Sequence, residues 1–407
     1  MTRAIGVEVD CPFTPAMLRK VVYAGSQSAS FVQATKDLEA LAEVDVSRER
    51  VQRWTKRVGA ERLAQIERQA ASYQGLPLPA QRKSPTGQVP QVACVMMDGG
   101  RIQVRDRHEE NRDATGYWKE SLVGCCLSMA SKEHLKDPSP TIPKTFVDPQ
   151  RMRELSREIK GFSVSIEDAE APDEASPDDR DGRPEVLVRS VVATRQGQET
   201  FGERLVAAAY QRGFHAARRK AFVADGAAGN WGVHKKHFSH YTPVLDFTHA
   251  ICYVYAAAMA GRNHQAAWND YVTWAQWLWE GATEKLIAAV ATRSEVLGPP
   301  PDGDETSPAA IVARTLTYLK NQRSRMKYDQ YRKLGLPITS SHIESTIKQV
   351  NRRVKGTEKF WDQGAEPMLQ LAADHLSETA NYSQFWRQRR HRLACARAST
   401  RAYHTAA

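Results

Sequence analysis

The sequence predicts an α/β fold, and two observations lead to that prediction. Short apolar runs of strand length, two of which end at Asp-Gly, alternate with stretches in which apolar residues recur at helical spacing. The composition, with 41% hydrophobic and 26% charged residues, is that of an ordinary globular protein. Strands that alternate with helices imply a sheet covered by helices. The length of 407 residues suits two or three domains.

Residues 1–75 are predicted to form a helical DNA-binding domain. Thr14 and Pro15 make a helix start, a second helix is expected from about Ser30, and Ser47 begins a third. The third helix turns apolar residues inward and presents a basic outer face: Arg48, Arg50, Arg53, Lys56 and Arg57. Three short helices with a basic last one are typical of a helix-turn-helix module. The alternative is a small helical cap with a solvated face.

The next segments are predicted to be a linker and then the first part of the α/β core. Residues 76–90 are rich in proline and polar residues and read as the linker. The core is expected over 91–250, with a surface or disordered acidic loop at 167–185. Its strands are expected in five places: 92–97, 101–105, 122–128, 186–193 and 221–224, followed by a short one at 244–247, with a helix over 202–214.

The remaining chain is predicted to be mostly helical. Residues 251–334 form a helical insertion, in which closely spaced tryptophans are interpreted as helix core rather than as a base-stacking platform. Residues 335–385 close the core with a helix. The basic tail, 386–407, is either a phosphate-contacting segment or a solvated end, and its candidate DNA contacts are Arg387, Arg389 and Arg390.

Charge and composition favour a nucleic-acid partner and exclude several other classes. The formal charge is +10 and the pI about 9.3, which favours a polyanion, although many basic proteins bind no DNA. Six cysteines without C-x-x-C spacing, no signal-peptide pattern and no long apolar run predict a cytoplasmic, nucleoid-associated protein without a membrane partner. The motifs of P-loop nucleotide sites, H-E-x-x-H metalloproteases and G-x-S-x-G hydrolases are missing.

Three acidic residues are the candidate catalytic and metal-binding groups. Asp98 and Asp225 each end an apolar strand at an Asp-Gly pair, and Glu344 lies near the start of a helix. Carboxylates on rigid elements suit a pair of divalent ions in phosphoryl chemistry. Each has a structural alternative. Asp-Gly is a common turn signal, and Ser341-x-x-Glu344 has the pattern of a capping box.

The helix that contains Glu344 favours a catalytic role for this residue over a capping role. Four basic residues follow Glu344 along this helix and are expected to contact DNA: Lys348, Arg352, Arg353 and Lys355. One acid beside these basic residues suggests that Glu344 binds a metal ion next to a surface that contacts DNA phosphates. The pair Asp246 and His249 would lie on one side of a helix that begins there, at a strand end near Asp225. These two residues are the candidate auxiliary groups of the site, although a lone histidine is more often a core residue.

Several segments together resemble the core blocks of bacterial insertion-sequence transposases, of the ISKra-type group within the Mutator-like set. They are FVADGAAGNW, VLDFTHA, GLPITSSHIESTIKQVNRRVKGTEKFW, VMMDGGRI with GYWKESLVGC, and FTPAMLRKVV with the helical region that follows it. The resemblance covers most of the chain. It is weakest at 131–200 and in the helical insertion.

The resemblance implies a ribonuclease-H-like mixed sheet flanked by helices and a D-D-E triad of Asp98, Asp225 and Glu344. Asp246-x-x-His249 resembles the [C/D]-x-x-H signature that follows the second aspartate. Such enzymes use two Mg²⁺ or Mn²⁺ ions to hydrolyse a phosphodiester at element ends, and the freed 3′-hydroxyl attacks target DNA. Their partners are double-stranded DNA and further copies of the chain, at least a dimer in the synaptic complex.

The third block departs from the family pattern P-I-G-S-G-x-x-E. Thr339 and Ser341 stand where that pattern has glycines, and we expect a stiffer turn before Glu344. Two other functions stay open at this point. One is a non-catalytic DNA-binding protein derived from a transposase, and the other is a nuclease of the same fold that cuts without joining strands.

Overall fold

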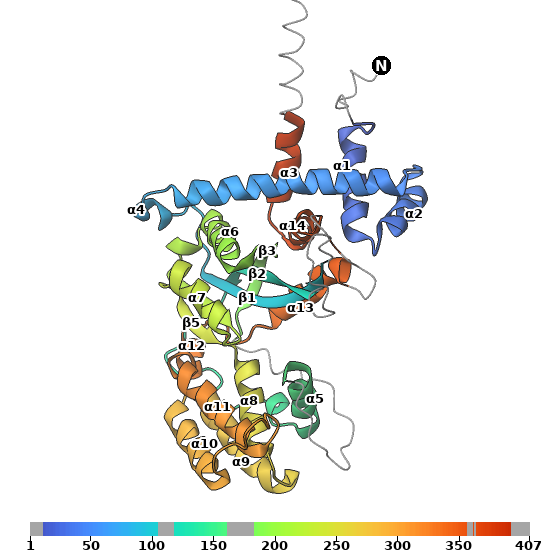
Figure 1. Cartoon of the computed structure of the whole chain (residues 1–407). Coiled ribbons are helices and arrows are strands. Elements are labelled where there is room, and N and C mark those ends of the chain that lie inside the picture. Colours follow the sequence, from blue (N-terminus) through green and yellow to red (C-terminus); the bar gives the residue numbers. More distant parts are fainter. Residues whose placement is uncertain (1–10, 105–117, 161–182, 356–360, 362–363, 392–407) are drawn as a thin grey trace, which may run out of the picture.

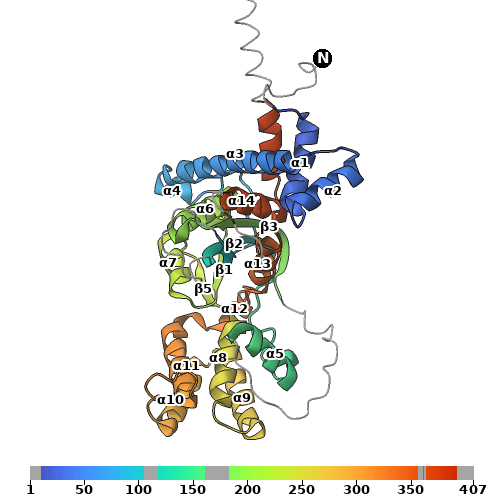
Figure 2. The ribbon, with the colours of Figure 1, turned by 45° about the vertical axis from the view of Figure 1, so that its right-hand side comes forward.

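A computed structural model describes residues 11–104, 118–160, 183–355, 361 and 364–391. A central sheet lies between two groups of helices, with the helices of residues 15–74 on one side and those of residues 247–322 on the other (Figure 1, Figure 2). Most of the acidic segment predicted at 167–185, residue 105 of the predicted second strand, and the tail beyond residue 391 lie outside the described residues.

The sheet has five strands in the order β3-β2-β1-β4-β5. Their bounds are β1 Val92–Gln103, β2 Trp118–Ala130, β3 Glu185–Thr194, β4 Arg219–Ala224 and β5 Thr242–Leu245. β1 pairs antiparallel with β2, and β2 antiparallel with β3. β4 is parallel to β1, and β5 is parallel to β4. The predicted α/β class, with a mixed sheet flanked by helices, is confirmed.

The predicted break between the strands 92–97 and 101–105, at Asp98-Gly99-Gly100, is wrong. β1 continues through these residues, and Asp98 pairs with Val123 of β2 inside the ladder. Both glycines are extended, because neither is among the residues with positive φ. A Cβ at Gly100 would lie 3.4 Å from Asn351 and 3.6 Å from Ile347, both on α13. Gly100 therefore allows close packing of α13 on the strand, and neither glycine reverses the chain.

The N-terminal helices begin where the sequence predicts. They are α1 Pro15–Gln27, α2 Phe31–Ala42 and α3 Arg48–Gln74. Thr14 and Ser30 accept capping hydrogen bonds at the starts of α1 and α2, and Ser47 is the N-cap residue of α3. The three helices share a small core built around Trp54. Leu41 is 86% exposed, although its spacing from buried Ala34 and Leu38 would favour the inner face of α2.

The third helix is longer than expected and joins the N-terminal helices to the core. α3 runs across the top of the sheet region in Figure 1 and contacts α14, Ala365–Leu376. Arg62 of α3 and Asp374 of α14 form a buried ion pair, with Nη2 2.9 Å from Oδ1. Gly59 has room for no side chain, because a Cβ there would lie 2.8 Å from the Pro367 carbonyl. The predicted linker after α3 contains a short helix, α4 Leu78–Gln81.

The other helices cover the two faces and the lower end of the sheet. Their bounds are α5 Pro149–Lys160, α6 Gly197–Gln211, α7 Ala228–His237, α8 Phe247–Met259, α9 His264–Trp279, α10 Thr283–Leu297, α11 Pro308–Gln322, α12 Tyr328–Lys333 and α13 Ser341–Val354. Turns of 3-10 helix occupy η1 Lys144–Phe146, η3 Phe214–Ala216 and η4 Arg323–Arg325. In the insertion, Trp274 and Trp279 are buried in the main core, as predicted. No described helix combines the length and apolar character needed to cross a lipid bilayer.

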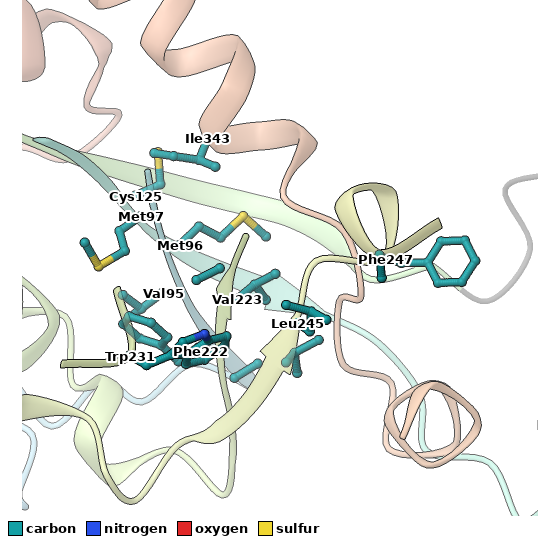
Figure 3. Packing of buried hydrophobic residues seen from close by; sticks show 14 of the residues in the cluster. Val95, Met96, Met97, Cys125, Phe222, Val223, Trp231, Leu245, Phe247 and Ile343 are labelled. Carbon is teal, nitrogen blue, oxygen red and sulfur yellow. The ribbon is translucent and has the colours of Figure 1, made fainter. Parts of the chain in front are cut away.

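Two helices pack on opposite faces of the sheet near the functional residues. Ile343 of α13 lies against Cys125 and Met96 on one face, whereas the Trp231 ring of α7 packs at a tilt against Phe222 on the other (Figure 3). Side chains alternate along a strand, so Asp98 shares the face of Met96 and Gly100. Asp98 therefore faces the side of the sheet that α13 covers.

Candidate active site

Asp98, Asp225 and Asp246 lie at one level across three neighbouring parallel strands. The register of β1 with β4, continued to residue 98, brings Asp98 level with Asp225. The register of β4 with β5 brings Asp246 level with Asp225, and the Asp246 N–H donates to the Ala224 carbonyl (2.8 Å). Neighbouring strands are roughly 4.8 Å apart. Residues 98, 225 and 246, far apart in the sequence, thus form one row.

The Asp98 carboxyl group is largely removed from water and lies among other charged groups. Burial raises its pKa to about 6, and the negative charges of Asp225 and Glu344 act in the same direction. The Gly99 N–H, which donates to Asp98 Oδ1 at 2.6 Å, and nearby His249 oppose that rise. Because ionisation of this carboxyl group is costly, a bound cation would stabilise its ionised form.

Asp225 follows β4 in a tight turn that orients its carboxylate. Oδ1 accepts hydrogen bonds from the Ala227 N–H (3.0 Å) and from Nδ2 of buried Asn230 (2.8 Å). Gly226 has φ +100°, which favours glycine at this position. Asn230, which the sequence analysis did not single out, lies five residues after Asp225 on α7 and donates to this oxygen.

Glu344 lies in the first turn of α13, half-buried, and within electrostatic range of Asp98. The N-cap residue is Ser340 rather than Ser341, and its side chain makes no capping hydrogen bond. The capping box considered as the alternative role of Glu344 is therefore wrong. Thr339 and Ser341 both have negative φ, so the turn tolerates side chains where the family pattern has glycines.

Asp246 is a buried carboxylate that joins the starts of two helices. It is the N-cap residue of α8 and accepts hydrogen bonds from the backbone of Thr248 and His249, both at 3.2 Å. It also accepts from the Ser340 N–H, the N-cap of α13, at 2.9 Å. Burial alone would raise the pKa of Asp246, but the hydrogen bonds from His249 and Ser340 outweigh it and hold the pKa below its usual value.

His249 turns one ring nitrogen towards Asp246. Nδ1 lies 2.5 Å from Asp246 Oδ2, a contact in which a protonated Nδ1 donates. Each Asp246 oxygen therefore already accepts two hydrogen bonds, so we assign Asp246 the role of orienting the imidazole. The prediction that Asp246 and His249 lie together at a strand end beside Asp225 is confirmed.

Among the described residues, Asp246, His249 and Glu344 form a group that could hold a metal ion. One ligand atom from each lies within 4.8 Å of the others. The charges of Asp225 and Glu344 act on Asp98. The oxygens of these three carboxylates, however, do not all lie within 4.8 Å of one another. Carboxylate oxygens with an imidazole nitrogen suit Mg²⁺, Mn²⁺ or Zn²⁺.

Metal binding is expected to weaken as the pH falls through about 6, because the Asp98 proton competes with the ion. The pKa of Asp98 is raised in the folded protein. Its ionisation therefore costs folding free energy, and the metal-free protein should lose stability as the pH rises through about 6. Melting temperatures at pH 5 and pH 7.5, with and without Mn²⁺, test this. A gain from Mn²⁺ that is no larger at pH 7.5 would contradict it.

The basic residues predicted to contact DNA separate into exposed and buried sets. The exposed ones are Lys348 and Arg352 on α13, Lys355 directly after it, Arg48, Arg50 and Arg53 on α3, and Arg387 and Arg390 on the helix of residues 381–391. The exposed residues of α13 continue the face of the helix below Glu344. They remain candidates for phosphate contacts.

Arg353 and Arg389 contact protein instead. Arg353 donates from Nε and Nη2 to the Gly25 carbonyl of α1, at 3.3 and 3.2 Å, and is 6% exposed. Arg389 is 5% exposed and pairs with Glu61 of α3 at 2.8 Å. Both lie on the apolar side of their helices, because Arg353 is three residues after buried Val350 and Arg389 is four residues after buried Phe385. Arg353 and Arg389 therefore connect the N-terminal helices to the rest of the protein, and they are not part of the candidate DNA surface.

In comparisons with models of protein families and with curated proteins, the chain shows no significant match. The function is therefore inferred from the residues, from the resemblance they carry, and from the geometry of this site.

Proposed function

We propose that this protein is a DNA transposase of the DDE class. It cleaves phosphodiesters at the ends of an insertion sequence and transfers the 3′-hydroxyl to target DNA. The observation that carries the proposal is the position of the three acids. Asp98 and Asp225 are level on parallel strands, and Glu344 lies on the helix that packs over the face of Asp98. The mixed five-stranded sheet flanked by helices is compatible with the ribonuclease-H-like fold implied by the resemblance.

The donor set fits divalent metal ions. Asp98, Asp225 and Glu344 supply hard oxygen ligands, and Asp98 has a pKa that a bound cation would lower. If two Mg²⁺ or Mn²⁺ ions are bound by these residues, they would supply an activated attacking oxygen and stabilise the leaving oxygen. Asn230 holds the Asp225 carboxylate in place, and Asp246 holds the His249 ring at the edge of the same site.

The positions of the exposed basic residues support double-stranded DNA as the partner. Lys348, Arg352 and Lys355 extend from the catalytic helix, so DNA phosphates held there would lead to Glu344. The basic face of α3 suits recognition of the element ends. Synapsis of two ends requires at least two copies of the chain in the active assembly.

A reconstituted reaction tests the proposal. The purified protein is mixed with Mg²⁺ or Mn²⁺, a target plasmid, and linear DNA carrying the sequences that flank its coding region. We expect joined products with short direct duplications of the target. Cleavage without joining would identify a nuclease of the same fold. DNA binding with neither cleavage nor metal binding would identify a non-catalytic DNA-binding protein.

Recognition of the element ends is expected to depend on the exposed arginines of α3. Removal of residues 1–75 would not test this cleanly, because it would leave Asp374 without Arg62. The double substitution Arg50→Ala, Arg53→Ala should instead lower the preference for end DNA over unrelated DNA by roughly tenfold. Competition binding with labelled end fragments measures that ratio. An equal loss of affinity for both DNAs would contradict the helix-turn-helix interpretation.

A further inference from the structure

The helical insertion reaches the turn that carries Asp225. The Tyr318 hydroxyl on α11 donates to the Asp225 carbonyl at 2.9 Å. One helical turn further on, Gln322 donates from Nε2 to the Gly226 carbonyl at 3.0 Å. Side chains four residues apart lie on one face of a helix. A single face of α11 therefore satisfies two consecutive carbonyls of the turn.

The backbone shape of the turn and the Tyr318 ring fit each other closely. Gly226 has φ +100°, and a Cβ at this position would lie 2.8 Å from Cε2 of the Tyr318 ring. The ring stacks on Tyr253 of α8, with centroids 3.8 Å apart. Gln322 is itself 6% exposed and accepts a hydrogen bond from Arg325 at 2.6 Å. Contacts outside the turn therefore hold the side chains of both donors in place.

The two sides of Asp225 are held by different parts of the protein. Its backbone carbonyl is bound from the insertion, while Oδ1 is bound from α7 through Asn230 and the Ala227 N–H. Among the described residues, no hydrogen bond reaches the second oxygen, Oδ2, and the charge of Asp225 raises the pKa of Asp98. The Asp225 carboxylate is thus held through Oδ1, and it lies within electrostatic range of Asp98.

We propose that Tyr318 and Gln322 are positioning residues that fix the Asp225 turn so that its carboxylate can bind the metal. This inference rests on the proposed function, because it assumes that Asp225 is a metal ligand. It gives the helical insertion a defined role in the chemistry, as the element that supports the second acid from outside the sheet. Groups that orient a metal ligand typically affect metal affinity or activity by about tenfold to a hundredfold.

Tyr318→Phe tests the proposal, since it removes one hydroxyl and keeps the ring stacked on Tyr253. The matched control is Tyr331→Phe, because the Tyr331 hydroxyl donates in the same way, at 3.0 Å, to the carbonyl of Pro243, which lies inside β5 and not in the turn that carries Asp225. Mn²⁺ affinity of each full-length protein is measured by calorimetric titration. We expect Tyr318→Phe to weaken Mn²⁺ binding by about tenfold and Tyr331→Phe to leave it within about twofold.

The DNA cleavage assay separates positioning from a general loss of structure. Tyr318→Phe should raise the Mn²⁺ concentration needed for half-maximal cleavage by about the same factor, and saturating Mn²⁺ should restore the rate. Unchanged Mn²⁺ affinity in Tyr318→Phe, or an equal loss in Tyr331→Phe, would overturn the positioning role while leaving the transposase proposal intact. Absence of Mn²⁺ binding by the wild-type protein would overturn both.

Discussion

Asp225→Asn is expected to reduce cleavage and strand transfer by on the order of a thousandfold or more, with DNA affinity nearly unchanged. Asparagine can still accept hydrogen bonds from Asn230 and from the Ala227 N–H, so the turn should keep its shape. It supplies no negative charge to a divalent ion. DNA affinity depends mainly on phosphate contacts made by basic side chains elsewhere. Asp98→Ala and Glu344→Ala should have the same effect.

The matched control is Asp302→Asn, which removes an exposed acid from the loop between α10 and α11. It should retain full activity. The readouts are the yield of joined products and the affinity for end DNA at one fixed salt concentration. Activity of Asp225→Asn within tenfold of wild type would show that this carboxylate does not bind the metal ion required for the reaction.

Arg62→Met is expected to destabilise the protein by about 3–5 kcal/mol. Arg62 and Asp374 are 2% and 6% exposed, and Arg62 donates to both Asp374 oxygens. Loss of the guanidinium leaves a buried carboxylate without a counter-charge. Burial already raises the pKa of Asp374, and Arg62 opposes that rise. The destabilisation should therefore shrink as the pH falls, because protonation removes the uncompensated charge.

Urea denaturation at pH 7 and pH 5 measures this effect. Arg68→Met, at an exposed position on the same helix, is the control and should change the free energy of unfolding by less than about 0.5 kcal/mol. The double variant Arg62→Met, Asp374→Leu should recover much of the loss. Equal unfolding free energies for wild type and Arg62→Met would show that the N-terminal helices are not energetically coupled to α14.

Local patterns predicted the elements well. Thr14, Ser30 and Ser47 mark the first three helix starts because capping depends on neighbouring residues. Asp98 was misplaced because Asp-Gly favours a turn in isolation, whereas here the ladder with β2 and the packing of α13 keep the glycines extended. Tertiary contacts overrode the local preference.

The candidate site was predicted in its acids but not in the residues that support them. Asp246 and His249 could be paired from their spacing, since a helix start brings them together. Tyr318 could not be found in this way, because its contact with Asp225 joins residues 93 positions apart. Arg353 was predicted on a basic surface, but its contact with the Gly25 carbonyl depends on how α1 docks against α13.

Anomalous diffraction from crystals grown with Mn²⁺ tests the shared metal site most directly. The two-metal proposal predicts two peaks about 4 Å apart, in contact with the carboxylates of Asp98, Asp225 and Glu344. Crystals without density between these side chains, or with a single ion held by Asp246 and His249 alone, would contradict it.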